Sequence, residues 1–97
     1  MPTRESIAQF IKEWIEIELK NWRTFNEMLD QGFCGDLATN IWECFDNDTS
    51  IHFQSCSDPV HTWIEFEGIH FDMQNPNGVA DWKQLAYFKD SPNAVMD

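Results

Sequence analysis

The chain has 97 residues, of which 42 % are hydrophobic and 24 % are charged, and its 17 acidic residues against six basic ones give a formal net charge of −11 at pH 7. This length and composition predict one folded domain spanning residues 1–97 and argue against a disordered chain. The segment from Thr24 to Trp82 contains acidic residues but no Lys or Arg. Because a surface of that charge repels phosphate, we expect no direct binding to nucleic acid or to an anionic membrane.

The three cysteines, together with the absence of a signal-peptide or membrane-spanning pattern, predict free thiols in a reducing cytoplasm. The sequence has no Cys-x-x-Cys pair, no His-x-x-x-His pair and no glycine-rich loop that would hold a phosphate. Zinc sites commonly show such closely spaced ligands, so we expect neither a metal nor a cofactor.

The first predicted element is a long amphipathic helix over residues 6–29. Its apolar residues recur at steps of three and four, Thr3 is suited to the N-cap, and the Asp-Gln-Gly of residues 30–32 is suited to end it. A second helix is expected to begin at or near Cys34, because the apolar residues from Leu37 to Phe45 keep helical spacing. Residues 46–48 are expected to close it.

After this helix the apolar pattern changes to an alternating one. We expect a short strand at 51–53, a loop at 55–59, and two strands at 60–66 and 69–73 that form a hairpin. Residues 75–78 are expected to break the second of these strands, and residues 81–88 to form a short helix or turn on the core. Residues from about 90 to 97 are expected to be a flexible tail. The predicted fold is α+β, with a long N-terminal helix plus a Cys-headed helix packed on a small antiparallel sheet.

The hairpin turn determines which side chains share a face of the sheet. With Glu67-Gly68 as the turn, Trp63 lies opposite Asp72 and His61 opposite Gln74, so these four side chains share one face. His61 and Asp72 are diagonal neighbours, about 7–8 Å apart at the backbone and within reach of each other. The other face is almost wholly apolar and is expected to contact the long helix; it consists of Val60, Thr62, Ile64, Phe66, Ile69, Phe71 and Met73.

Cys34 has the surroundings that a cysteine nucleophile needs. It is expected in the first turn of a helix, where the helix dipole favours a thiolate, and the glycine that follows lets a substrate approach closely. The pattern Gly-x-Cys-Gly-Asp-x-Ala, followed by His-x-Trp-x-Glu-x-x-Gly-x-x-Phe-Asp, resembles the core of the papain-like and transglutaminase-like superfamily of cysteine enzymes. In that superfamily the Cys heads a helix, and the His and Asp come from two adjacent antiparallel strands. The resemblance covers about residues 31–73 and implies that Cys34 is the nucleophile, His61 the base and Asp72 the residue that orients the base.

An enzyme of this kind also needs donors for an oxyanion and residues that support its triad. The expected donors are backbone N–H groups at the nucleophile and one side-chain amide. The candidates are Cys34, Gly35, Gln31 and Asn26. Three further residues on the polar face of the hairpin are candidates to support the triad, namely Trp63, Gln74 and His70.

Two functions from different classes follow. The first is a minimal thiol hydrolase or acyl-transfer enzyme that acts on an amide bond of a peptide or protein. The second is a small acidic inhibitor or adaptor that binds a basic protein surface by imitating the charge of nucleic acid. Its expected contact residues are Asp36, Glu43, Asp46, Asp48 and Asp58. A hybrid of the two, in which a thiol-enzyme fold is kept as a scaffold without its activity, is a further alternative.

The stretch from His61 to Trp82 is also similar to small uncharacterised bacterial and phage proteins, a resemblance that implies no activity. In a phage, the second function would be that of a viral anti-defence protein in the host cytoplasm. A cysteine on a helix as apolar as this one also has a purely structural interpretation, as a small buried residue.

Overall fold

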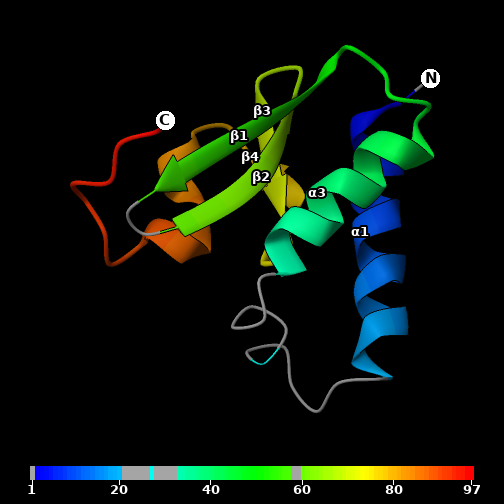
Figure 1. The fold of residues 1–97 in the computed structure, drawn as a ribbon, viewed down its shortest axis with the longest axis horizontal. Helices are drawn as coiled ribbons and strands as arrows, with labels where there is room; N and C mark the ends of the chain where they lie inside the picture. The colour runs from blue at the N-terminus through cyan, green and yellow to red at the C-terminus, as the bar shows by residue number, and fades with distance from the viewer. Residues whose placement is uncertain (1, 21–26, 28–32, 58–59) are drawn as a thin grey trace.

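The computed structural model describes residues 2–20, 27, 33–57 and 60–97. In this part of the chain two helices, α1 (Arg4–Leu19) and α3 (Phe33–Cys44), lie beside one antiparallel sheet of four strands (Figure 1). The strands β1 (Ile51–Ser57), β2 (Val60–Phe66), β3 (Ile69–Asp72) and β4 (Asn75–Val79) are ordered as in the chain. The predicted α+β fold is confirmed. No described helix combines the length and the apolar character needed to cross a membrane.

Helix α1 begins as predicted and ends earlier than predicted. Thr3 is its N-cap and forms a capping box with Ser6, which satisfies free N–H groups of the first turn. The helix ends at Leu19 rather than at residue 29, with Lys20 as its C-cap. The apolar stripe stops before that point, because Glu18 takes the next core-facing position and Ile17 and Leu19 are exposed. Residues 21–26 and 28–32 lie outside the described residues.

Helix α3 is the predicted cysteine-headed helix, and it begins one residue before Cys34. Its buried side chains, Leu37, Ala38 and Ile41, repeat at steps of one, three and four, as one face of a helix requires. The helix ends at Cys44, two residues before the predicted closing segment. Asp46 and Asn47, both with positive φ, then turn the chain toward β1.

The hairpin of β2 and β3 has the predicted register. Ile64 pairs with Phe71 and Phe66 with Ile69, and the turn at Glu67-Gly68 has φ of 54° and 78°. Two positive φ values in a two-residue loop match the right-handed twist of the flanking strands.

Two sheet predictions were wrong. Residues 55–57, expected in a loop, continue β1 and pair with residues 60–62 of β2. Residues 75–78, expected to break the strand as a turn, belong to β4, which pairs with β3 across a register shift. An edge strand tolerates Pro76 because only one side of it needs ladder hydrogen bonds. Gly78 has φ of 82°, and a Cβ there would collide with the side chains of Ile69 and Phe71.

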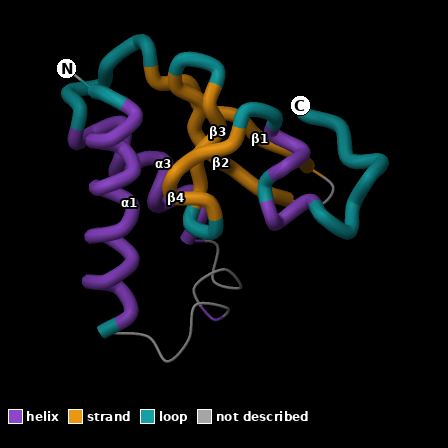
Figure 2. Tube along the Cα trace, turned by 180° about the vertical axis from the view of Figure 1, so that it is seen from behind, coloured by secondary structure: helices purple, strands orange, loops and turns teal. Residues whose placement is uncertain are grey.

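The two helices and the C-terminal segment lie on opposite sides of the sheet (Figures 1 and 2). Each face of the sheet carries a hydrophobic cluster. The first cluster lies between the sheet and the two helices, and its buried members include Ile7, Ile11, Leu37, Ile41, Ile64, Phe66, Phe71 and Met73. The second cluster is formed with the C-terminal segment on the other side of the sheet, and its members include Cys56, Trp63, Leu85, Phe88 and Ala94. The face with the predicted polar chemistry is therefore covered as well.

The C-terminal segment covers that second face. Two short 3-10 helices, η1 (Trp82–Gln84) and η2 (Ala86–Phe88), occupy the span predicted to form a short helix or turn, and Leu85 and Phe88 are buried there. Within the segment 90–97, expected to be loose, residues 95–97 lie against β1 instead. The carboxylate of Asp97 accepts hydrogen bonds from the hydroxyls of Ser55 and Ser57, and Ala94 is buried.

Candidate active site

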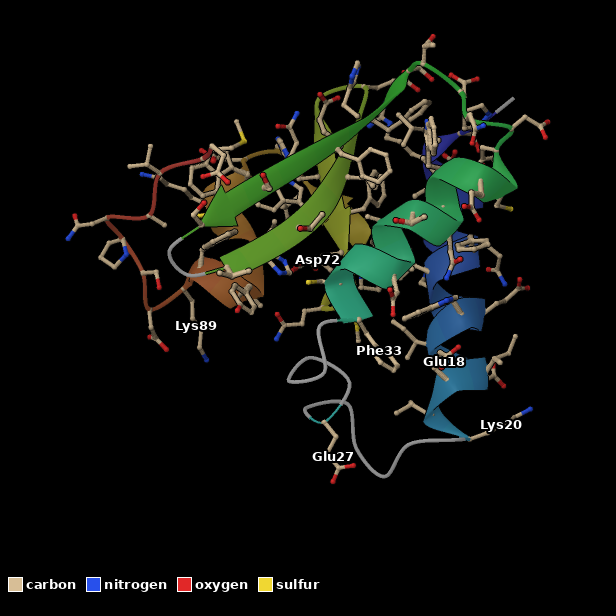
Figure 3. The ribbon with its side chains drawn as sticks, viewed as in Figure 1. Glu18, Lys20, Glu27, Phe33, Asp72 and Lys89 are labelled. Atoms are coloured by element: carbon tan, nitrogen blue, oxygen red, sulfur yellow. The ribbon has the colours of Figure 1, made fainter. Side chains whose placement is uncertain are left out.

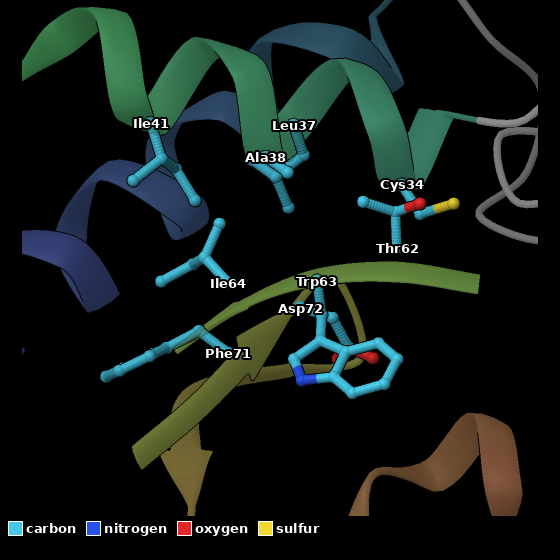
Figure 4. Close-up of a pocket in the computed structure, with 9 residues that line it drawn as sticks. All are labelled: Cys34, Leu37, Ala38, Ile41, Thr62, Trp63, Ile64, Phe71 and Asp72. Carbon is cyan, nitrogen blue, oxygen red and sulfur yellow. The ribbon is translucent and has the colours of Figure 1, made fainter. Parts of the chain in front are cut away.

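Cys34 lies in the first turn of α3, at the end of the helix that meets the start of β2 (Figure 4). The packing of Leu37, Ala38 and Ile41 on the sheet sets this position, because these side chains and Ile64 fill the space between α3 and β2. The thiol is half-buried and lines a narrow cavity that Thr62 and Asp72 also border. Cys34 therefore lies at the boundary between the core and the solvent.

His61 and Asp72 form a buried pair across β2 and β3, as the hairpin register predicts. The imidazole Nε2 lies 2.8 Å from Oδ2 of Asp72, and the two residues are only 1 % and 3 % exposed. The other carboxylate oxygen, Oδ1, accepts the backbone N–H groups of Gln74 at 3.0 Å and Asn75 at 2.8 Å. Both oxygens are thus held, and Oδ2 is the acceptor for a proton on Nε2.

This pairing leaves Nδ1 as the ring atom for proton transfer. With its proton on Nε2, the neutral imidazole has a free lone pair on Nδ1. Nδ1 is buried, and among the described residues none satisfies it at hydrogen-bond geometry. After Asp72, the thiol of Cys34 contributes most to raising the pKa of the imidazole. Catalytic hydrogen bonds are often long in the absence of substrate, so an Nδ1 atom without a hydrogen-bond partner is compatible with a general base.

The pKa values of Cys34 and His61 are shifted toward each other. Interaction with the His61 imidazole lowers the pKa of the Cys34 thiol, burial acts in the opposite direction, and the backbone N–H groups of Thr62 and Gly35 also lower it. Burial by itself would lower the pKa of His61, but the hydrogen bond to Asp72 and the interaction with the Cys34 thiol outweigh burial and raise it. The two shifts converge, as a thiolate beside an imidazolium requires.

Aromatic rings enclose the imidazole. Tyr87 of η2 lies face to face with it, with ring centroids 4.1 Å apart and planes 8° apart. Trp63 is stacked at 5.7 Å, and Phe88 meets the ring edge-on at 5.6 Å. Trp63 in turn donates from Nε1 to Nδ1 of His70 at 3.0 Å, and burial lowers the pKa of His70. Trp63 and His70 are thus near His61, as the shared face of the hairpin predicts.

Of the other predicted site residues, some lie beside the triad and some lie outside the described residues. Gly35 is beside the thiol, in the first turn of α3. Gln74 holds Asp72 through its backbone, while its side-chain Oε1 is buried and has no partner among the described residues. Gln31 and Asn26 lie outside the described residues, so no side-chain amide at the oxyanion position is described. Tyr87 and Thr62 were not expected near the site. Nothing in the sequence indicates that Tyr87 contacts His61, because this contact depends on how the C-terminal segment folds back over the sheet.

The predicted acidic contact residues fall into separate groups. Asp36 and Glu43 line a groove between α1 and α3, where Phe33 and Glu18 lie on facing sides (Figure 3). Asp46 and Asp48 are in the turn after α3, and Asp58 is outside the described residues. Within the described ranges, no three His, Cys, Asp or Glu side chains are grouped so that they could hold a metal ion.

No protein-family model, no curated protein and no solved structure matches this chain. The residues of the site therefore provide the argument for its function.

Proposed function

We propose that the protein is a minimal thiol hydrolase or acyl-transfer enzyme that acts on an amide bond, with Cys34, His61 and Asp72 as its triad. The observation that carries this proposal is the buried contact between His61 and Asp72, in which Nε2 lies 2.8 Å from Oδ2. The other ring nitrogen of His61, Nδ1, has no hydrogen-bond partner among the described residues, and the imidazole interacts with the Cys34 thiol. A structural histidine needs a partner for each buried nitrogen, whereas a base needs one nitrogen left for the proton.

The reaction begins with proton transfer from the thiol of Cys34 to Nδ1 of His61. The thiolate attacks the amide carbonyl carbon, and the C–O π electrons move onto oxygen to give a tetrahedral oxyanion. When the oxyanion collapses, the C–N bond breaks and the imidazolium donates its proton to the leaving amine, which leaves a thioester on Cys34. His61 then accepts a proton from water or from an amine as it attacks the thioester. The thiolate leaves, and the product is an acid or a new amide.

The start of α3 supplies donors for the oxyanion. The first N–H groups of a helix have no partner within the helix, and they carry the positive end of its dipole. Those of α3 surround Cys34, and the N–H of Gly35 already interacts with the sulfur in the free protein. Preorganised donors of this type stabilise developing negative charge without reorganising.

The test is the pH dependence of alkylation of each cysteine by iodoacetamide, followed by mass spectrometry. Cys44 is exposed and serves as the control for an ordinary accessible thiol. Cys56 is buried, so its alkylation measures local opening of the structure. We expect Cys34 to react well below the ordinary thiol pKa of about 8.5, and His61→Ala to remove that reactivity. If Cys34 and Cys44 respond to pH in the same way and His61→Ala changes nothing, the proposal fails.

A second candidate function, recognition of a basic protein, has one specific observation in its favour. Asp36, Glu43 and Glu18 line the same groove between α1 and α3, and within the described residues none of the three forms an ion pair. Carboxylates in this state are available to a cationic partner. The binding should weaken steeply with salt and be lost in Glu43→Lys, while Cys34→Ala leaves it intact. Binding that is insensitive to salt would contradict this candidate.

A further inference from the structure

Tyr87 occupies one face of the His61 imidazole, and no step of the proposed reaction uses it. The two rings are almost parallel, with planes 8° apart and centroids 4.1 Å apart. The titratable groups around His61 come from several elements: Asp72 from β3, Cys34 from α3, Cys56 opposite it on β1, and Tyr87 itself from η2. Of these, only Tyr87 contacts the imidazole through the face of a ring.

The contact acts differently on the two charge states of His61. The face of an aromatic ring carries negative charge from its π electrons, so it attracts a cation placed over it. An imidazolium is such a cation, whereas the neutral imidazole gains only packing. The stack also restrains rotation of the imidazole, so that Nε2 stays on Asp72 while Nδ1 stays free for the thiol.

The position of Tyr87 is tied to the turn that holds Asp72. The backbone N–H of Ala86, the residue before Tyr87, donates to Oδ1 of Asn75 at 3.0 Å. The backbone N–H of Asn75 donates in turn to Oδ1 of Asp72 at 2.8 Å. Leu85 and Phe88, on either side of this pair of residues, are buried at 0 % and 3 % exposure and anchor η2 in the second cluster. The ring of Tyr87 and the carboxylate of Asp72 are thus held by one hydrogen-bonded connection.

We propose that Tyr87 is a positioning residue for His61. Its ring fixes the orientation of the imidazole and favours the protonated form of His61, so that Cys34 is kept as a thiolate. This inference rests on the proposed function, because it concerns the base of that reaction. Tyr87 acts on the reacting atoms through its stack on His61.

The test compares Tyr87→Leu, which removes the π face, with Tyr87→Phe, which keeps it. Phe53→Leu is the matched control, since Phe53 is a half-exposed aromatic on β1 that packs on Trp42. Two quantities are measured: the titration of the His61 ring by NMR, and the rate of Cys34 alkylation from pH 5 to 9. A cation–π contact changes an equilibrium constant by about two- to thirtyfold, so we expect the alkylation rate at low pH to fall by about that factor in Tyr87→Leu. Phe53→Leu should match the wild type, and Tyr87→Phe, which keeps the π face, should stay closer to the wild type than Tyr87→Leu.

A second substitution keeps the shape of the ring and guards against loss of folding. Pentafluorophenylalanine at position 87 reverses the charge of the ring face, and it should shift the His61 titration toward acid relative to Tyr87→Phe. The inference is overturned if this change and Tyr87→Leu leave both profiles unchanged while His61→Ala still removes the reactivity of Cys34, a result under which the proposed function stands. If His61→Ala also leaves Cys34 unchanged, both proposals are overturned together.

Discussion

Asp72→Asn tests the triad most directly, because it changes charge and hydrogen-bond direction with little change of shape. The backbone N–H groups of Gln74 and Asn75 need an acceptor, so the amide oxygen should stay on them, and the amide NH₂ then faces His61. Nε2 must accept from that NH₂, which moves the ring proton to Nδ1. A ring with its proton on Nδ1 cannot take another from the Cys34 thiol at that atom.

The magnitude follows from the burial of the pair. His61 and Asp72 are 1 % and 3 % exposed, so water does not screen their 2.8 Å contact. A hydrogen bond to a charged group is worth about 1.5–3 kcal/mol, which corresponds to a change of roughly 10- to 100-fold in the population of the ion pair. We therefore expect the alkylation rate of Cys34 at pH 6 to fall by roughly 10- to 100-fold in Asp72→Asn.

The assay is the iodoacetamide rate of Cys34 relative to Cys44 in the same molecule, with folding verified by circular dichroism. Asp90→Asn is the control, because it removes one negative charge from an exposed residue of the C-terminal segment. A folded Asp72→Asn protein whose Cys34 reacts at the wild-type rate would refute the reasoning, since Asp72 would then have no part in holding His61.

Three further outcomes are expected. Gly78→Ala should destabilise the fold by about 1–3 kcal/mol in urea denaturation, since φ there is 82° and the new Cβ meets Ile69 and Phe71; an unchanged midpoint would show that β4 adjusts freely. Leu37→Ala should cost about 2–5 kcal/mol by the same measurement, because the side chain is 2 % exposed, and a loss below 1 kcal/mol would mean that α3 does not depend on this contact. The folded pKa of His61 is raised, so the part of its stabilisation over His61→Gln that depends on protonation should be fully present below the unfolded pKa of about 6.5 and lost as pH rises through the folded pKa. A stability difference that grows with pH would contradict that direction.

The local parts of the fold could be predicted from the sequence. The alternation of residues 60–66 and 69–73 around Glu67-Gly68 defines the hairpin, and the period of two then puts His61 and Asp72 on one face. The apolar spacing after Cys34 likewise predicts a helix that begins there. These predictions succeed because each depends on neighbours in the chain.

The remainder depends on contacts between distant segments. Asn-Pro-Asn-Gly has the composition of a turn, and it becomes β4 only because the free edge of β3 is available to it. The stack of Tyr87 on His61 requires residues 82–88 to return across the sheet, which no local pattern encodes. The early end of α1 could have been read from Glu18, which interrupts the apolar stripe.

The contact of residues 94–97 with β1 has a consequence for self-association of the protein in solution. β1 is an edge strand, and its outer side accepts the backbone of this segment through the Cys56–Met96 bridge and the N–H of Asp97, which donates to the carbonyl of Ser55 at 2.9 Å. An uncovered edge is a template on which another chain can add a strand. We therefore expect the C-terminal residues to protect this edge of the sheet from pairing with another chain. A chain shortened by these four residues should aggregate at lower concentration than the full one.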